Sequence, residues 1–141
     1  MPVPVFNPLQ NQTITSAMVN LTRATADVAT SETTTSTSDT DLATAGPAIT
    51  LSSGVTQDFT LFWSGRMWNS AAAYSVMGVS LAGAAVGTND DTHAQMNSVD
   101  NRYGGCLIAT AHASGSADTA KYRVSATTGT WASRRLIGVA I

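Results

Sequence analysis

Charged residues are scarce in this sequence: only 16 of the 141 residues are charged, and the net charge is −2. Surface charge keeps small domains apart in solution, so we expect part of this surface to be covered by a partner. The straight-chain helix formers are also scarce, with one Glu, one Lys and four Gln, against 21 Thr and 15 Ser. This composition favours strands and predicts an all-β domain.

Cysteine is nearly absent, because Cys106 is the single thiol of the chain. It can form neither an intrachain disulfide nor a paired-cysteine metal site. Its position in the apolar run Cys106–Ala109 predicts a buried, inert thiol. The chain also has no dense Lys/Arg cluster, and since phosphate neutralisation dominates nucleic-acid affinity, we expect no nucleic acid partner.

Two targeting signals are missing as well. Residues 1–8 lack the basic region and the continuous apolar core of a signal peptide, so we expect synthesis and folding in a cytoplasm. Between Met67 and Asn89 no residue is charged, and Gly83 and Gly87 have the spacing of a membrane helix-packing motif. Asn, Ser, Thr and Ala stand there where Leu would be expected, so we predict no membrane helix and no membrane partner.

The few charges are unevenly distributed along the chain. Residues 1–60 contain one arginine and five acidic residues, a net charge of −4, and the remainder has a net charge of +2. Opposite charges of this kind could favour docking between subunits or onto a partner. They could equally be scattered, solvated surface charges.

The first residues form a distinct segment. Prolines at positions 2, 4 and 8 fix φ and bias the preceding residues toward extended conformations. We therefore predict an extended N-terminal arm over residues 1–12, followed by one domain over residues 13–141. The side chains that would bind a neighbouring surface are those of Pro2, Val3, Pro4, Val5, Phe6 and Leu9.

The domain itself shows strand patterning. We expect a first strand near Met18–Val28, and we leave open whether the Thr/Ser-rich block Thr30–Thr40 is a surface loop or an edge strand. Beyond Gly46-Pro47, short runs separated by Gly, Ser, Asn and Asp turns predict an antiparallel sandwich or barrel. These runs are Ala48–Leu51, Gln57–Met67, Tyr74–Leu81, Cys106–Ala113, Thr119–Ala126 and Ala132–Ile141.

Candidate chemistry is sparse. Asp90, Asp91 and His93 could ligate a divalent ion if Asp100 or a carbonyl completed the site, but Asn89–Thr92 is also typical of a turn, and we predict no metal and no cofactor. His112, Ser114 and Asp118 have the residue types of a hydrolase triad without a Gly-x-Ser-x-Gly motif. We therefore expect a protein that is not an enzyme.

The tryptophans are the remaining candidates for a binding role. Trp63 lies in an alternating strand and is expected in the core. Trp68, which precedes Asn69-Ser70, and Trp131, just after a turn, are expected to be more exposed. Because aromatic residues are enriched at interfaces, we predict that Trp68 and Trp131 contact another subunit.

The last third of the chain predicts a closing β-hairpin, in which Thr119–Val124 and Ala132–Ile137 flank a small Thr/Gly turn. Over Pro47–Ile141 this pattern of strands and turns resembles the small jelly-roll domains of tailed-phage virion proteins, which serve as trimeric capsid decoration (cement) proteins or as fibre tips. The resemblance implies an antiparallel jelly-roll β-sandwich with an extended N-terminal arm. It carries no catalytic signature.

The same resemblance implies a partner and a location. A decoration protein binds the major capsid protein on the outer capsid surface of the virion as a homotrimer and stabilises the shell by linking capsomers. The alternative is the receptor-binding or structural tip of a tail fibre, with the loop Asn89–Arg102 and the aromatic residues as its contact surface. Absence of heptads and repeats favours the decoration protein.

Overall fold

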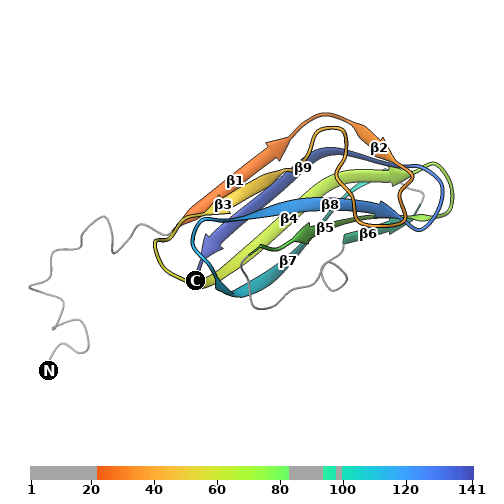
Figure 1. Ribbon diagram of the computed structural model, residues 1–141. Helices are drawn as coiled ribbons and strands as arrows, with labels where there is room; N and C mark the ends of the chain where they lie inside the picture. The colour runs from red at the N-terminus through yellow and green to blue at the C-terminus, as the bar shows by residue number, and fades with distance from the viewer. Residues whose placement is uncertain (1–21, 83–93, 98–99) are drawn as a thin grey trace, which may run out of the picture.

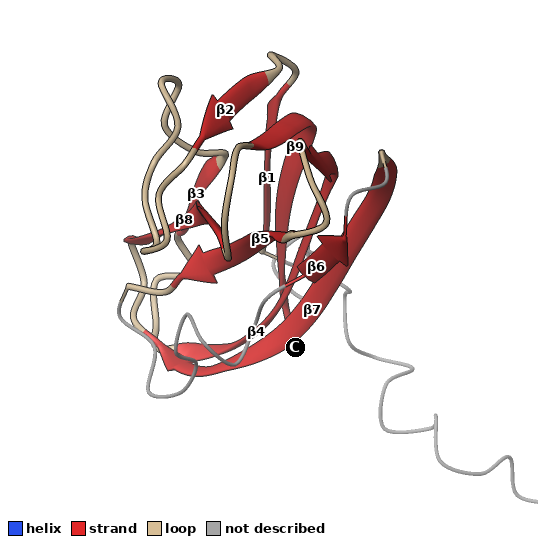
Figure 2. Ribbon diagram, turned by 90° about the vertical axis from the view of Figure 1, so that its right-hand side faces the viewer, coloured by secondary structure: helices blue, strands red, loops and turns tan. Residues whose placement is uncertain are grey.

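A computed structural model describes residues 22–82, 94–97 (backbone only) and 100–141 of the chain. The described residues form strands and loops, with no helix among them (Figure 1, Figure 2). The strands are β1 (Arg23–Val28), β2 (Glu32–Thr34), β3 (Ala48–Leu51), β4 (Gln57–Asn69), β5 (Tyr74–Ser80), β6 (Ala94–Asn97), β7 (Asn101–His112), β8 (Ser116–Val124) and β9 (Gly129–Ala140).

The strands form two antiparallel sheets packed face to face. A five-stranded sheet has the order β1-β9-β4-β7, with β2 also pairing with β9, and a four-stranded sheet has the order β3-β8-β5-β6. The chain passes repeatedly from one sheet to the other, so that most neighbours within a sheet are distant in sequence. This architecture confirms the predicted all-β class and the antiparallel jelly-roll sandwich.

The predicted closing hairpin is wrong in its pairing. β8 and β9 are both strands, but β8 belongs to the four-stranded sheet and pairs with β3 and β5, whereas β9 pairs with β1, β2 and β4. The connection at residues 125–128 therefore crosses between the layers. Both strands turn an apolar face toward the same core, and the alternation of side chains is the same whether two strands share a sheet or face each other.

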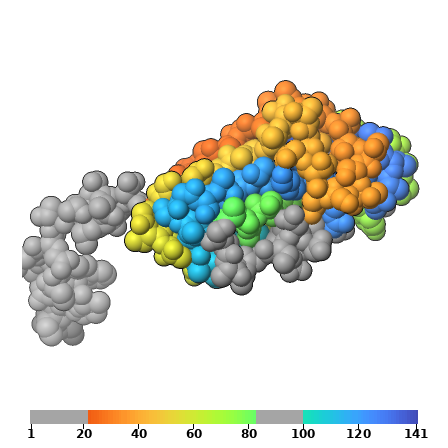
Figure 3. Space-filling model, viewed as in Figure 1, coloured from red at the N-terminus to blue at the C-terminus, as the bar shows by residue number. Residues whose placement is uncertain are grey.

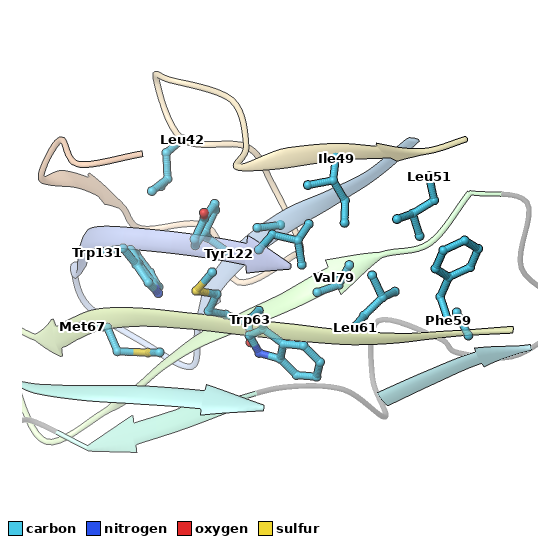
Figure 4. Packing of buried hydrophobic residues seen from close by; sticks show 14 of the residues in the cluster. Leu42, Ile49, Leu51, Phe59, Leu61, Trp63, Met67, Val79, Tyr122 and Trp131 are labelled. Carbon is cyan, nitrogen blue, oxygen red and sulfur yellow. The ribbon is translucent and has the colours of Figure 1, made fainter. Parts of the chain in front are cut away.

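The core lies between the two sheets and is set by strand alternation. On β4, Phe59, Leu61, Trp63 and Met67 point inward and are at most 4% exposed. They meet inward side chains of the opposite sheet, among them Val79 and Tyr122, in one continuous apolar cluster (Figure 4). The Trp63 indole also donates a hydrogen bond of 3.1 Å to the Met77 carbonyl, which ties the two layers together.

Several expected boundaries change. Strand β6 lies within the predicted loop Asn89–Arg102, and β7 starts five residues before the expected position. The Thr/Ser-rich block contains both expected alternatives, because Glu32–Thr34 forms a short strand on β9 and the residues after it form a loop. None of the described residues belongs to a helix long and apolar enough to cross a membrane. The predicted arm and the first part of the predicted strand Met18–Val28 lie outside the described residues.

Candidate interaction surface

The uneven charge distribution is neutralised largely within the chain. Four acidic residues from the first third pair with four bases from the last third, on β8 and β9. The pairs are Asp27–Arg135, Glu32–Arg134, Asp39–Arg123 and Asp41–Lys121. The interpretation that this asymmetry favours docking on another molecule is therefore not needed to explain these eight charges.

Arg134 is the most buried of these bases. Its side chain has no exposed surface, and its Nη2 donates to Glu32 Oε2 at 2.9 Å and to Thr30 Oγ1 at 3.2 Å. The guanidinium carbon lies 5.3 Å from the centre of the Tyr122 ring, a cation–π geometry. Burial raises the pKa of the Tyr122 hydroxyl, although the nearby Arg134 opposes this, and the hydroxyl donates to the Gly46 carbonyl at 2.7 Å. The cluster holds β2 and the following loop onto the sandwich.

The loop after β2 flanks strand β8, and we call residues 36–44 the flanking segment. Thr40 and Tyr122 exchange backbone hydrogen bonds of 3.0 Å, and the Val124 amide donates to the Ser36 carbonyl at 2.9 Å. The Leu42 side chain enters the core. In the space-filling view the orange flanking segment lies beside the blue atoms of β8 (Figure 3). The backbone groups at this edge of β8 therefore find their hydrogen-bond partners within the chain.

The outer face of the five-stranded sheet differs from this. The register places Phe62 between Cys106 on β7 and Ile137 on β9, with Ile108 and Val139 in the adjacent row. Phe62 is 44% exposed and Ile108 is 54% exposed. We call Phe62, Cys106, Ile108, Ile137 and Val139 the apolar face. Contiguous apolar residues on a sheet exterior mark interaction sites more often than isolated ones do.

A hollow of about 330 Å³ opens beside Phe62 in the apolar face, and Gly104, Gly105 and Ile137 are among the residues that line it. A Cβ at Gly105 would lie 2.4 Å from the Trp63 indole, so a side chain here would displace the core tryptophan. Gly104 is exposed and has no side chain to fill the outer surface of β7. The missing side chain of Gly104 therefore leaves a recess on the outer face, next to an exposed aromatic ring.

Two single-residue expectations are wrong. Trp131 is fully buried, because the alternation of β9 turns it inward, where its ring meets Tyr122 edge-on at 5.5 Å. A side chain in this position does not provide the exposed intersubunit contact that was predicted. Cys106 is exposed and not buried, because its inward neighbours on β7 are Gly105 and Leu107. Trp68 is half-buried, with the Arg66 guanidinium 5.7 Å from its ring, and its contact with another subunit stays a prediction.

His112 and Asp118 come together, but within the described part of the chain Ser114 does not join them. Both side chains are fully buried, and His112 Nε2 lies 3.0 Å from Asp118 Oδ2. Burial raises the pKa of the Asp118 carboxyl, and hydrogen bonds with His112 and the Ala82 amide oppose this rise. Ser114 Oγ instead accepts a hydrogen bond from the Gly54 amide at 2.9 Å. The pair links the end of β7 to β8 and has no access for a substrate.

Other candidates lie outside the described residues, namely the arm residues and Asp90, Asp91 and His93. Asp100 is described, and it pairs with Arg66. Elsewhere in the described ranges there is no group of three or more His, Cys, Asp or Glu side chains that could hold a metal ion. The apolar face is therefore the candidate site that the structure adds, and one of its residues, Cys106, was expected from the sequence to be a buried thiol.

No known family model matches this sequence, and no curated protein sequence matches it. Among solved structures, this chain is similar to a crystal structure of murine APRIL at pH 5.0, with a TM-score of 0.47 and 11% identity over 84% of this chain and 99% of that chain. A second similar structure is the enzymatically active domain of bacteriophage CBA120 tailspike protein 4, with a TM-score of 0.33 and 10% identity. That match covers 85% of this chain and 19% of the tailspike chain.

Proposed function

We propose that this protein is a structural virion protein that binds the outer surface of an icosahedral phage capsid as a homotrimer. It stabilises the shell by linking capsomers, partly through its N-terminal arm, and its partners are the major capsid protein and other copies of itself. The proposal is supported by the sequence resemblance to decoration proteins and by the jelly-roll fold. It involves no catalysis, no cofactor and no nucleic acid.

The observation that carries the proposal is the apolar face. An exposed Phe62 and Ile108 on the outer side of a sheet suit a broad protein surface better than a small ligand, because interface centres are apolar and poor in charge. The ion pairs Arg66–Asp100 and Arg135–Asp27 flank this face and match the polar rim of such interfaces.

Shell stabilisation then follows from mass action. A protein that binds the assembled shell and not its separate parts lowers the free energy of the assembled state by an amount that grows with its concentration. The arm would add apolar contacts, or a strand, to an exposed sheet edge on a neighbouring capsomer. This role of the arm rests on the proline spacing and apolar residues of the sequence.

The test is retention on undecorated expanded capsids. Purified protein is incubated with the shells, and the shells are pelleted. The wild type is compared with two separate variants, a chain lacking residues 2–9 and the full chain with Phe62→Ser. Tyr74→Ser is the matched control, because Tyr74 is 50% exposed on the four-stranded sheet. We expect saturable binding that both changes weaken and the control does not, and a trimer by sedimentation.

Unchanged retention of the arm-deleted chain would overturn the role of the arm. Absence of binding by the wild type, together with attachment to host cells, would replace the decoration protein by a fibre tip. Unchanged retention of Phe62→Ser would remove the apolar face from the capsid contact.

A further inference from the structure

Three arginines gather at one end of the outer face of the five-stranded sheet. Arg66 on β4 is directly opposite Arg102 on β7, and Arg135 on β9 is opposite Ser64, the next outward residue of β4. Like charges directly opposite each other on a sheet are destabilising. Their arrangement here therefore needs nearby negative charge.

Two of the three arginines pair with an acidic residue of the same chain. Arg66 pairs with Asp100, and Arg135 pairs with Asp27. Arg102 is exposed, and among residues 22–82 and 100–141 no carboxylate pairs with it. The set thus carries one guanidinium whose charge these residues leave uncompensated.

Arg102 faces a groove of about 410 Å³, whose other lining residues include Asp27, Ser133 and Arg135. Ser133 has a φ of 49°, a left-handed conformation that is unusual for serine, and it lies where the register of β9 against β4 shifts between Ser64 and Arg66. Such bulges re-aim side chains. Here the bulge leaves Ser133 and Arg135 exposed, with the buried Arg134 between them.

We propose that this groove binds an aspartate or glutamate side chain of a protein partner, with Arg102 as its charged donor and Ser133 as a polar neighbour. A guanidinium offers two parallel N–H groups to a carboxylate, which is the geometry that favours Arg over Lys in such sites. The inference rests on the proposed function, in which the partner is a capsid protein, and it names the chemistry of the contact.

The neighbouring hollow narrows the choice of partner segment. Arg135 lines both the charged groove and the apolar hollow beside Phe62. Gly104, in the hollow, is two residues from Arg102 on the same face of β7, a separation of about 7 Å along a strand. Side chains i and i+2 of an extended segment have the same spacing. The occupant is thus an extended segment with an apolar residue two positions from an acidic one.

Capsid retention tests the contact on the full protein. Arg102→Gln removes the charge, Arg102→Glu reverses it, and Arg23→Glu is the control, because Arg23 is exposed at the β1 edge of the same sheet. We expect Arg102→Gln to weaken binding by roughly tenfold and Arg102→Glu by more. Arg23→Glu should remain within about twofold of the wild type, and melting curves of all three variants should match it.

A peptide titration tests the groove without shells. Protein labelled with nitrogen-15 is titrated with acetyl-Thr-Leu-Thr-Glu-Thr-amide and with the same peptide carrying Gln for Glu. We expect shifts of the Gly104 and Gly105 amides and of the Arg102 Nε signal with the Glu peptide only. Arg102→Gln should abolish them.

The two experiments separate the two proposals. Full shell binding by Arg102→Glu would overturn the proposal that the groove binds a carboxylate, and it would leave the proposed capsid function standing. A peptide response with no shell binding by the wild type would overturn the capsid function and support the groove. Equal shifts with both peptides, or none, would show that the groove does not select a carboxylate.

Discussion

The two sheets share one core but present different outer faces. On the four-stranded sheet, the outward cations Lys121 and Arg123 of β8 each pair with an aspartate of the flanking segment. On the five-stranded sheet, the corresponding face has Phe62 and Ile108 exposed. It also has Arg102, which pairs with no acid of the described residues.

This difference separates two uses of a sheet surface. Where the chain supplies its own acidic residues and its own backbone partners, a substitution should change the free energy of unfolding. Where apolar side chains stay exposed, a substitution should change association and leave unfolding nearly unaltered. The comparison therefore predicts which assay each residue affects.

The largest effect is expected in the core that both sheets share. Val124→Asp places a carboxylate at a position that is 1% exposed, and an unpartnered buried charge costs several kcal/mol. We expect no cooperative thermal transition by circular dichroism. Ala126→Asp, on an exposed residue just after β8, is the control and should melt as the wild type does. A soluble Val124→Asp variant with a sharp transition would contradict the assigned strand face.

The next largest effect is expected at the buried ion pair between Glu32 and Arg134. Glu32→Gln leaves the buried Arg134 guanidinium without its counter-charge and should lower the free energy of unfolding by about 3 kcal/mol in urea. Adding Arg134→Met should recover much of that loss, because no uncompensated charge remains.

The matched control for this ion pair is Asp27→Asn, whose partner Arg135 is more than half exposed. Its cost should stay below about 1 kcal/mol. Equal losses for Glu32→Gln and Asp27→Asn would show that burial of Arg134 does not govern the stability of the first pair.

A smaller effect concerns pH. Burial by itself would raise the pKa of Glu32, but hydrogen bonds from Thr44 and the charge of Arg134 together lower it below its ordinary value of 4.5. The folded state therefore binds this proton less tightly than the unfolded state. The stabilisation is fully present above pH 4.5 and is lost as the pH falls through the lowered pKa.

Because Asp118 has a raised pKa, its contribution changes with pH in the opposite sense, so only a difference between variants isolates Glu32. Urea unfolding of the wild type and Glu32→Gln between pH 5 and pH 3 makes that comparison. We expect the gap between them to narrow toward pH 3, and a constant gap would contradict the lowered pKa.

The smallest effect on stability is expected on the apolar face. Phe62→Ser and Ile108→Ser should each change the free energy of unfolding by only about 1 kcal/mol, because roughly half of each side chain is already in solvent. Retention on undecorated expanded capsids should nevertheless fall. A large loss of stability with unchanged association would reverse the roles of the two outer faces.

Sequence patterning located most strands because alternation is a local property. Ala48–Leu51 and the alternation of Phe59, Leu61 and Trp63 match β3 and β4. Pairing is not local, and the same alternation fits a strand in either layer, which is why β8 and β9 were assigned to one hairpin. Trp131 was expected at the surface because a turn precedes it, yet its register on β9 turns it inward.

The candidate site was harder to predict for a related reason. Phe62 could be singled out as the apolar residue on the outward side of β4. Its neighbours Cys106 and Ile137 lie more than forty residues further along the chain and join it only through the register of β7 and β9. Likewise, the local sequence does not show that Arg134 is buried and Arg135 exposed, because a bulge in β9 determines which of the two faces the core.

The position of β9 has a consequence for how this domain is made. The last strand in chain order lies inside the five-stranded sheet, between β4 on one side and β1 and β2 on the other. A nascent chain emerging from the ribosome cannot close this sheet until residues 129–140 are available. Until then β1 and β4 present open edges, so residues 129–140 convert an aggregation-prone intermediate into a closed sheet.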